Sequence, residues 1–148
     1  QRINAGLKWP NDLLINNKKV CGILIESEIN GDNNEFIIGI GINYSLPQKE
    51  SWWGDIGELA DILPREKLIN SILKKITFYA ENGYQNWKSA WEKRCIHMGK
   101  EIKAISNNQN DYELGKFKGI NEDGKMLLKT RNELKIISSG ECSIKGIY

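Results

Sequence analysis

The sequence is poor in the residues that build metal centres and disulfide frameworks. Its 148 residues include three cysteines, one histidine and three prolines. Cys21, Cys95 and Cys142 are widely spaced and form no CxxC pair, whereas a structural zinc site needs clustered nitrogen and sulfur ligands. An odd number of isolated cysteines also argues against a disulfide framework. We therefore expect reduced, mostly buried thiols in a cytoplasmic protein.

A strong charge of one sign and long hydrophobic runs are also absent. Lysine plus arginine number 21 and aspartate plus glutamate 19, which leaves a net charge of +2. Such a balance argues against binding to nucleic acid through bulk charge. No apolar run is long enough to span a bilayer, and the N-terminus lacks the order of a signal peptide. We expect a globular protein, and the start at Gln1 rather than Met hints at a missing upstream segment.

Three β-type runs dominate the first sixty residues and cover 13–15, 19–26 and 35–43. Asparagine-rich turns at 16–18 and 30–34 separate these runs. The runs are apolar on both faces, so we expect central strands of a covered sheet. Gly39 and Gly41 share one face of the third run, because strand side chains alternate. Two absent side chains on one face leave a slot that a ligand can approach closely.

Helical and then β-type patterns follow. Apolar residues recur at three- and four-residue spacing from Pro64 to Ala80, and Gly83 interrupts this helix. The stripe of a second helix, for which we expect core packing, carries Tyr84, Trp87, Trp91 and Cys95. Five short strands separated by turn residues predict a small β-barrel and cover 101–106, 113–120, 125–130, 133–137 and 141–144. The fold class is therefore α/β (α+β), with an α/β part at 1–97 and an all-β part at 98–148.

Two charged residues flank the first predicted hairpin. Asp12 and Lys19 can both lie near one end of a strand pair. A carboxylate there suits Mg²⁺, which prefers oxygen ligands. A lysine there can neutralise a carboxylate and a phosphate at once. The alternative is a surface turn with ordinary solvated charges, which the spacing alone favours.

Three segments point to a known family. Residues 8–12 read Lys-Trp-Pro-Asn-Asp, residues 19–26 read Lys-Val-Cys-Gly-Ile-Leu-Ile-Glu, and residues 39–43 read Gly-Ile-Gly-Ile-Asn. In this order and spacing they resemble the biotin protein ligase (biotin–[acetyl-CoA-carboxylase] ligase) family, and the first motif is the most specific. The resemblance implies the C-terminal half of a class II synthetase-like mixed-sheet catalytic domain at 1–97. It also implies an SH3-like C-terminal domain at 98–148.

The resemblance further implies roles for individual residues. Lys19 matches the catalytic lysine, which contacts the biotin carboxylate and the α-phosphate. The biotin-binding positions are Lys19, Gly22, Leu24, Gly39, Gly41 and Ile42. The ATP- and adenylate-binding positions are Asn43, Trp52, Trp53, Lys103 and Lys145, and the choice between the two tryptophans stays open. The metal-binding positions are Asp12 and Asn11.

The implied reaction is ATP-dependent and uses Mg²⁺. Family members condense biotin with ATP to give biotinyl-5′-AMP, and then transfer biotin to a lysine of a carrier protein. The expected partners are biotin, ATP and the biotin carboxyl carrier domain of acetyl-CoA carboxylase, with neither nucleic acid nor a membrane. A homodimer is a further expectation. A lysine together with Mg²⁺ offsets the repulsion between the carboxylate and the triphosphate.

The sequence departs from the family upstream of Lys8. A Gly/Arg-rich phosphate-binding loop and the residues that hold the biotin ureido group are not found there, so we expect this chain alone to be inactive or nearly so. Two alternatives remain open. One is a catalytically inactive truncated module that binds a carrier protein or self-associates through an exposed sheet edge. The other is a lipoate ligase relative, which fits the first motif less well.

Overall fold

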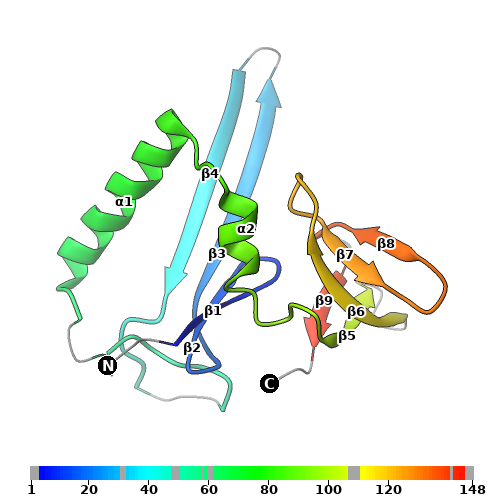
Figure 1. The fold of residues 1–148 in the computed structure, drawn as a ribbon. Coiled ribbons are helices and arrows are strands. Elements are labelled where there is room, and N and C mark those ends of the chain that lie inside the picture. Colours follow the sequence, from blue (N-terminus) through cyan, green and yellow to red (C-terminus); the bar gives the residue numbers. More distant parts are fainter. Residues whose placement is uncertain are drawn as a thin grey trace.

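Two antiparallel sheets and two helices make up the part of the chain that the computed structural model describes (Figure 1). It describes residues 4–30, 33–47, 51–57, 59, 62–106, 111–140 and 142–145. The N-terminal sheet contains, in order, β1 (Ala5–Lys8), β2 (Asp12–Ile15), β3 (Lys18–Asn30) and β4 (Asn33–Ile42). The helices are α1 (Arg65–Asn82) and α2 (Trp87–Glu92). The mixed α/β fold class expected from the sequence is thereby confirmed.

Two consecutive asparagines form the turn between β2 and β3. Asn16 and Asn17 have φ angles of 51° and 63°, in the left-handed region that asparagine tolerates and that a tight hairpin requires. The predicted turn at this position is therefore confirmed. β1 was not predicted, because four residues that include Gly6 are too few to show a strand pattern.

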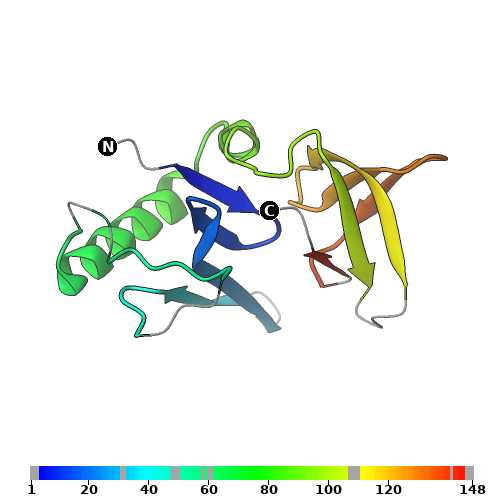
Figure 2. The same ribbon diagram turned by 90° about the horizontal axis from the view of Figure 1, so that it is seen from below.

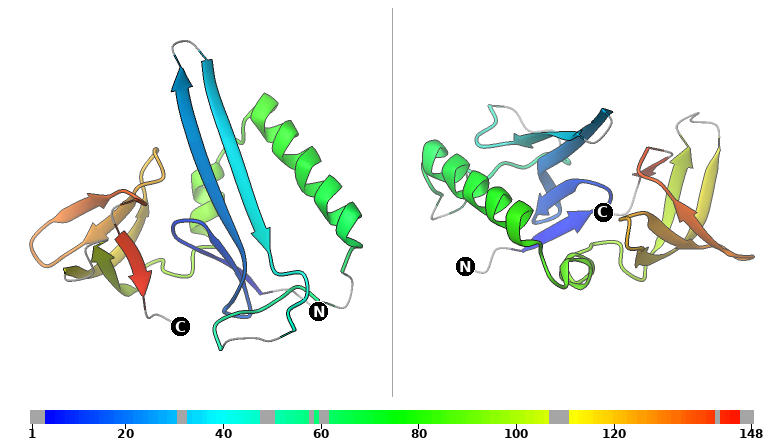
Figure 3. Two further views of the ribbon diagram at one scale, coloured as in Figure 1. Left: turned by 180° about the vertical axis from the view of Figure 1, so that it is seen from behind. Right: turned by 90° about the horizontal axis from the view of Figure 1, so that it is seen from above.

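The expectation of a sheet covered on both faces is wrong for the described residues. β2 pairs only with the first residues of β3, up to Gly22, so the rest of β3 and β4 forms a long two-stranded ribbon (Figure 1). Its apolar side chains are exposed, with 60% of Leu24, 65% of Phe36 and 67% of Ile37 accessible. α1 runs alongside the ribbon (Figure 3) but carries no buried residue. The apolar pattern is thus real, but its cover is not supplied by these residues.

The helix predicted from Pro64 is confirmed, and the following one is shorter than its stripe implied. Pro64 directly precedes α1, and Gly83 closes it with a φ of 69°. Asn86, with a φ of 59°, delays the start of α2. Core packing holds for only half of the predicted stripe: Trp91 packs against the core and Cys95 is buried, whereas the other two aromatic residues are exposed.

The second sheet matches the predicted barrel strands to within one residue at each end. In sequence order it contains β5 (Glu101–Ser106), β6 (Tyr112–Ile120), β7 (Met126–Lys129), β8 (Leu134–Ile137) and β9 (Cys142–Lys145). The strands pair in the order β8-β7-β6-β5-β9, and we call this unit the barrel. Its interior side chains, including Phe117, Met126 and Leu128, are fully buried. The main hydrophobic core of the described residues therefore lies in the barrel.

The linker between α2 and the barrel attaches to the free edge of β1. Leu7 N donates to Arg94 O at 2.8 Å, and Ile96 N donates to Leu7 O at 2.9 Å. Figure 2 shows α2 and this linker passing from the N-terminal sheet to the barrel. None of the three cysteines forms a disulfide in the described part of the chain, and Cys95 and Cys142 are buried. Among the helices described here, none is long and apolar enough to cross a membrane.

Candidate functional site

A β-bulge brings the two candidate charged residues together. Leu13 pairs with Cys21 and Leu14 pairs with Lys19, so Val20 is an extra residue on β3. A bulge changes the direction of the neighbouring side chains. The Lys19 side chain consequently lies on the same face as Asp12, and its Nζ is 2.7 Å from Asp12 Oδ1. The predicted juxtaposition of lysine and aspartate is therefore present as a direct ion pair.

Gly22 forms the floor beneath this ion pair. It pairs with Asp12 across β2 and β3. A Cβ atom at this position would lie 3.3 Å from Lys19 Nζ and 3.5 Å from Asp12 Oδ1. A side chain at this position would therefore contact both charged groups, most closely the ammonium. The glycine leaves room for the lysine side chain directly over the strand.

The remaining residues of the predicted glycine slot lie along the ribbon beyond Gly22. Gly22 pairs with Gly41, and Leu24 pairs with Gly39. Paired residues of antiparallel strands share a face, and so do residues two apart. These four predicted biotin-binding residues consequently lie on one face, next to the ion pair. Ile42 pairs with Cys21 on the opposite face, and the structure does not bring it to the slot.

The loop at 51–57, which we call the tryptophan loop, is hydrogen-bonded directly to the backbone of Lys19. Lys19 N donates to Trp52 O at 3.0 Å, and Gly54 N donates to Lys19 O at 2.9 Å. The Trp52 and Trp53 rings pack edge to face with centroids 4.9 Å apart, and both rings are exposed. A Cβ atom on Gly54 would lie only 2.8 Å from Lys18 Cβ. The close approach of loop and strand therefore depends on this glycine.

Asn43, directly after β4, contacts both β3 and the tryptophan loop. Its Nδ2 donates to Gly54 O at 2.9 Å and to Lys19 O at 3.3 Å, and its backbone N donates to Val20 O. The amide nitrogen is therefore used within the protein. The Asn43 Oδ1 atom accepts no hydrogen bond from the described residues and can accept one from a ligand.

Asp55 holds the tryptophan loop in place through hydrogen bonds, a role that was not predicted from the sequence. Its side chain is largely buried. Oδ2 accepts from Leu46 N at 2.9 Å, and Oδ1 accepts from Gly57 N at 3.0 Å. An aspartate two residues before a glycine is a known signal for a turn in which the carboxylate accepts a backbone N–H. That local signal was present, but the contact with Leu46 could not be read from spacing.

Asn11 and Cys21 complete the surroundings of the ion pair. Asn11 Nδ2 donates to Ile23 O at 2.6 Å, and Ile23 N donates to Asn11 O at 3.0 Å. The Asn11 Oδ1 atom, next to Asp12 in the sequence, is a carbonyl oxygen that can accept a hydrogen bond or bind a metal ion. Burial, and then the Asp12 charge, raise the pKa of the Cys21 thiol more than Lys19 lowers it. The thiol therefore stays protonated and is no nucleophile.

Lys103, one of the two predicted barrel lysines, makes its described contact within the barrel. Lys103 on β5 pairs with Lys145 on β9. The Lys103 Nζ atom lies 3.9 Å from the centroid of the Tyr112 ring, a cation–π contact within the barrel. Lys103 forms no hydrogen bond or ion pair with the Lys19–Asp12 pair. The side chain of Lys145 lies outside the described residues.

Family models match both ends of the chain. The model described as the biotin/lipoate A/B protein ligase family matches residues 1–43, and the biotin protein ligase C terminal domain matches residues 97–145. The bifunctional ligase/repressor BirA of Bacillus spizizenii is 33% identical over 96% of this chain and 47% of its own length. The BirA of Escherichia coli is 28% identical over 95% of this chain and 46% of its own length.

Solved structures share the fold. The biotin protein ligase from Aquifex aeolicus in complex with biotin and ATP superposes with a TM-score of 0.74 at 29% identity. The match covers 95% of this chain and 62% of that chain. The chain spans about half the length of the curated relatives it matches. The matching ends of the sequence, the relatives and the shared fold agree: the chain belongs to the biotin protein ligase family.

Proposed function

We propose that this chain contributes the catalytic lysine and the adenylate-facing loop of a biotin–[acetyl-CoA-carboxylase] ligase. The proposed reaction forms biotinyl-5′-AMP from biotin and ATP, and then transfers biotin to a lysine of the biotin carboxyl carrier domain of acetyl-CoA carboxylase. One observation carries the proposal: the Lys19–Asp12 ion pair lies over Gly22, at one end of the face that carries Gly39 and Gly41. The solved complex of the Aquifex aeolicus ligase with biotin and ATP supports it.

The first step requires that two anions meet. A carboxylate oxygen of biotin forms a bond to the α-phosphorus of ATP, the bond from that phosphorus to the bridging oxygen breaks, and pyrophosphate leaves. The Lys19 ammonium would stabilise the negative charge that develops between the carboxylate and the α-phosphate. Asp12, at 2.7 Å, would hold the ammonium over Gly22 in the absence of substrate. A cation that is already positioned needs little rearrangement when charge develops.

The glycine-bearing face of the ribbon would bind biotin, and the tryptophan loop would bind the adenylate. The face that carries Gly22, Leu24, Gly39 and Gly41 would hold the biotin rings and tail in an apolar site. Asn43 Oδ1 would accept a hydrogen bond from the adenine amino group. The exposed indoles of Trp52 and Trp53 would cover the adenylate and exclude water. Closing the site protects a mixed anhydride that water hydrolyses readily.

Asp12 and Asn11 carry side-chain oxygen atoms of the kind that Mg²⁺ prefers, and the substrate would supply further ligands. Asp12 Oδ2 and Asn11 Oδ1 would hold the ion together with phosphate oxygens and water. The described residues contain no cluster of three His, Cys, Asp or Glu that could hold a metal alone. When bound, Mg²⁺ neutralises phosphate charge. The protein's own task is then to keep the Asn11 side chain fixed, which its hydrogen bond to Ile23 O does.

Several further parts of the proposal concern organisation. We propose residues 1–97 as part of the catalytic domain and 98–148 as the C-terminal domain, in a cytoplasmic enzyme. Lys103 and Lys145 would approach the nucleotide, and a homodimer would use the unpaired edge that β4 presents among the described strands. Ile42 is the weakest of the proposed biotin contacts, because it lies on the face opposite the slot.

Biotin-dependent exchange of pyrophosphate into ATP tests the proposed reaction. The natural gene product that contains this sequence should catalyse exchange with biotin and not with lipoate. Exchange with lipoate alone would identify a lipoate ligase instead. The exposed apolar ribbon favours a second candidate, a non-catalytic carrier-binding module. No exchange with either acid, together with carrier binding, would establish that candidate and refute the first.

A further inference from the structure

The tryptophan of the first motif does not face the proposed ligand site. Trp9 is 2% exposed and lies in one apolar cluster with the barrel residues Phe117, Met126 and Leu128. Its indole Nε1 donates to Gly124 O at 3.0 Å, across 115 positions of sequence. A motif residue that follows β1 therefore forms part of the core of the barrel.

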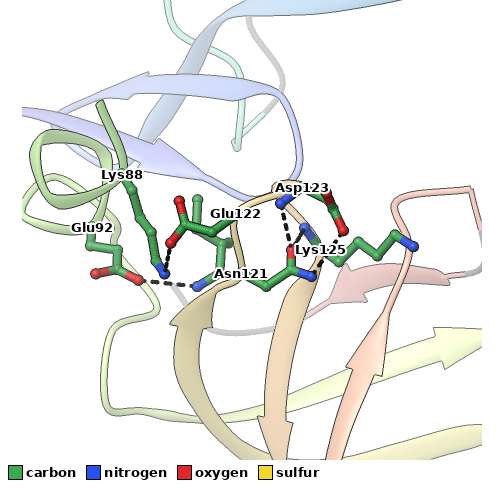
Figure 4. Close-up of polar contacts among 7 residues, drawn as sticks. Lys88, Glu92, Asn121, Glu122, Asp123 and Lys125 are labelled. Carbon is green, nitrogen blue, oxygen red and sulfur yellow. Dashed lines mark hydrogen bonds and ion pairs between the residues drawn. The ribbon is translucent and has the colours of Figure 1, made fainter. Parts of the chain in front are cut away.

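The turn that receives this hydrogen bond is closed by hydrogen bonds of its own. Asn121 Oδ1 accepts from Asp123 N at 3.0 Å and from Lys125 N at 2.8 Å (Figure 4). Gly124, between these two residues, has a φ of 75°. The turn between β6 and β7 thus presents a fixed carbonyl to the indole.

A second contact fixes the barrel from α2. Glu92 Oε1 accepts from Ile120 N at 3.1 Å. A Cβ atom on Gly119 would lie 2.3 Å from the same Glu92 oxygen, and the φ of Gly119 is 124°. Lys88 also forms an ion pair with Glu122 at 2.7 Å. The barrel is therefore attached at Trp9 and, from α2, at Glu92 and Lys88.

Only two residues separate Trp9 from Asp12. Asn11 is tied to Ile23 by hydrogen bonds in both directions, and Asp12 begins β2 and holds Lys19. The segment that carries the ion pair is thus fixed at one end by β3 and at the other by the barrel. Trp9 and Asp12 belong to the same short turn between β1 and β2, so a shift of the Trp9 ring would act on Asp12 through only two residues of backbone.

We propose that Trp9 is a positioning residue that couples the attachment of the barrel to the geometry of the Asp12–Lys19 pair. The barrel then contributes to the site through Trp9, whether or not its lysines also contact the nucleotide. The catalytic consequence of this coupling rests on the proposed function. The coupling itself does not, and it can be measured without biotin or ATP.

The reactivity of the Lys19 amine reports the coupling. The chain is treated under native conditions with a limiting amount of an amine-acylating reagent, and modification at each lysine is quantified by mass spectrometry. In Trp9→Phe, which keeps an apolar ring but removes the Nε1 donor, Lys19 should be modified about threefold faster or more, as expected when one hydrogen bond that restrains the segment carrying Asp12 is lost. Lys75 on α1 is the internal reference, and Trp87→Phe on α2 is the matched control.

Gly119→Ala disturbs the other attachment of the barrel, at Glu92, without touching the motif. It should push Glu92 away and also raise the modification of Lys19. An unchanged rate in Trp9→Phe would overturn the proposal. So would an equal rise at Lys75, which indicates general loosening, or a rise that Gly119→Ala does not reproduce.

Pyrophosphate exchange separates this proposal from the proposed function. In the natural gene product, Trp9→Phe should lower kcat with little change in the KM for biotin. If the unsubstituted protein catalyses no exchange, the proposed function fails while the result on Lys19 reactivity still stands. If exchange is normal in both proteins and the reactivity is unchanged, Trp9 has no positioning role.

Discussion

The single histidine should make the stability of this chain depend on pH between 4 and 6.5. His97 is completely buried, and neither ring nitrogen has a hydrogen-bond partner among the described residues. Its ring lies 5.7 Å from that of Phe117. Burial first, and then the charges of Lys8 and Lys100, lower its pKa from 6.5 to about 4. The folded protein therefore holds this ring neutral where the unfolded chain protonates it.

The sign and size of the effect follow from linkage. Below pH 6.5 the unfolded state binds one more proton than the folded state, so the free energy of unfolding falls as the pH is lowered. The contribution of His97 is fully present above pH 6.5. The loss is about 1.4 kcal/mol per pH unit within the window, and about 2 kcal/mol in all between pH 7 and pH 5. At pH values below the folded-state pKa of about 4 no further loss occurs.

Urea unfolding of the wild type and of His97→Leu, from pH 7.5 to pH 4.5, measures this term. Other titrating groups contribute equally to both proteins and cancel in the difference. The variant should match or exceed the wild type in stability at pH 7, since it removes a buried unsatisfied group worth about 1–3 kcal/mol. Its advantage should grow by about 2 kcal/mol by pH 5. Parallel curves for the two proteins would refute the argument.

Substitutions at three other positions test the site. Gly54→Ala should cost about 1–3 kcal/mol of unfolding free energy through overlap with Lys18, measured by urea unfolding, whereas Gly140→Ala meets no atom within 4 Å and should cost little. Asp55→Ala should lower the free energy of unfolding by about 1–3 kcal/mol because two backbone donors lose their acceptor, and Asp55→Asn should lower it by about half as much. Equal stability of the wild type and both variants would contradict this. Gly22→Val should displace the ion pair and lower exchange by about a hundredfold, while an unchanged rate would remove Gly22 from the site.

The barrel was predictable because its signals are local. Each strand is bounded by turn residues such as Asn121 and Gly124, so the boundaries fell within one residue of those observed. The asparagine turn after β2 was predictable for the same reason. The opposite orientation of Ile42 also follows from simple alternation after Gly41, which the family resemblance had overridden.

The features that were missed depend on residues far away in the sequence. The bulge at Val20 decides which face Lys19 occupies, and it exists only in the register with β2. Trp9 gave no sign of its place in the barrel, because its partner Gly124 is 115 positions away. The exposure of the ribbon was missed because an apolar strand pattern reports the need for cover and not its source.

The activity of Lys19→Ala in biotin-dependent pyrophosphate exchange tests the central claim most directly. The variant is made in the natural gene product beside Lys18→Ala, which removes the neighbouring charge on the same strand but has no place in the proposed site. Exchange should fall by about a hundredfold or more in Lys19→Ala, as when a preorganised charge-stabilising group is lost, and should change little in Lys18→Ala. Equal rates for the two variants would contradict the assignment of Lys19 as the catalytic lysine.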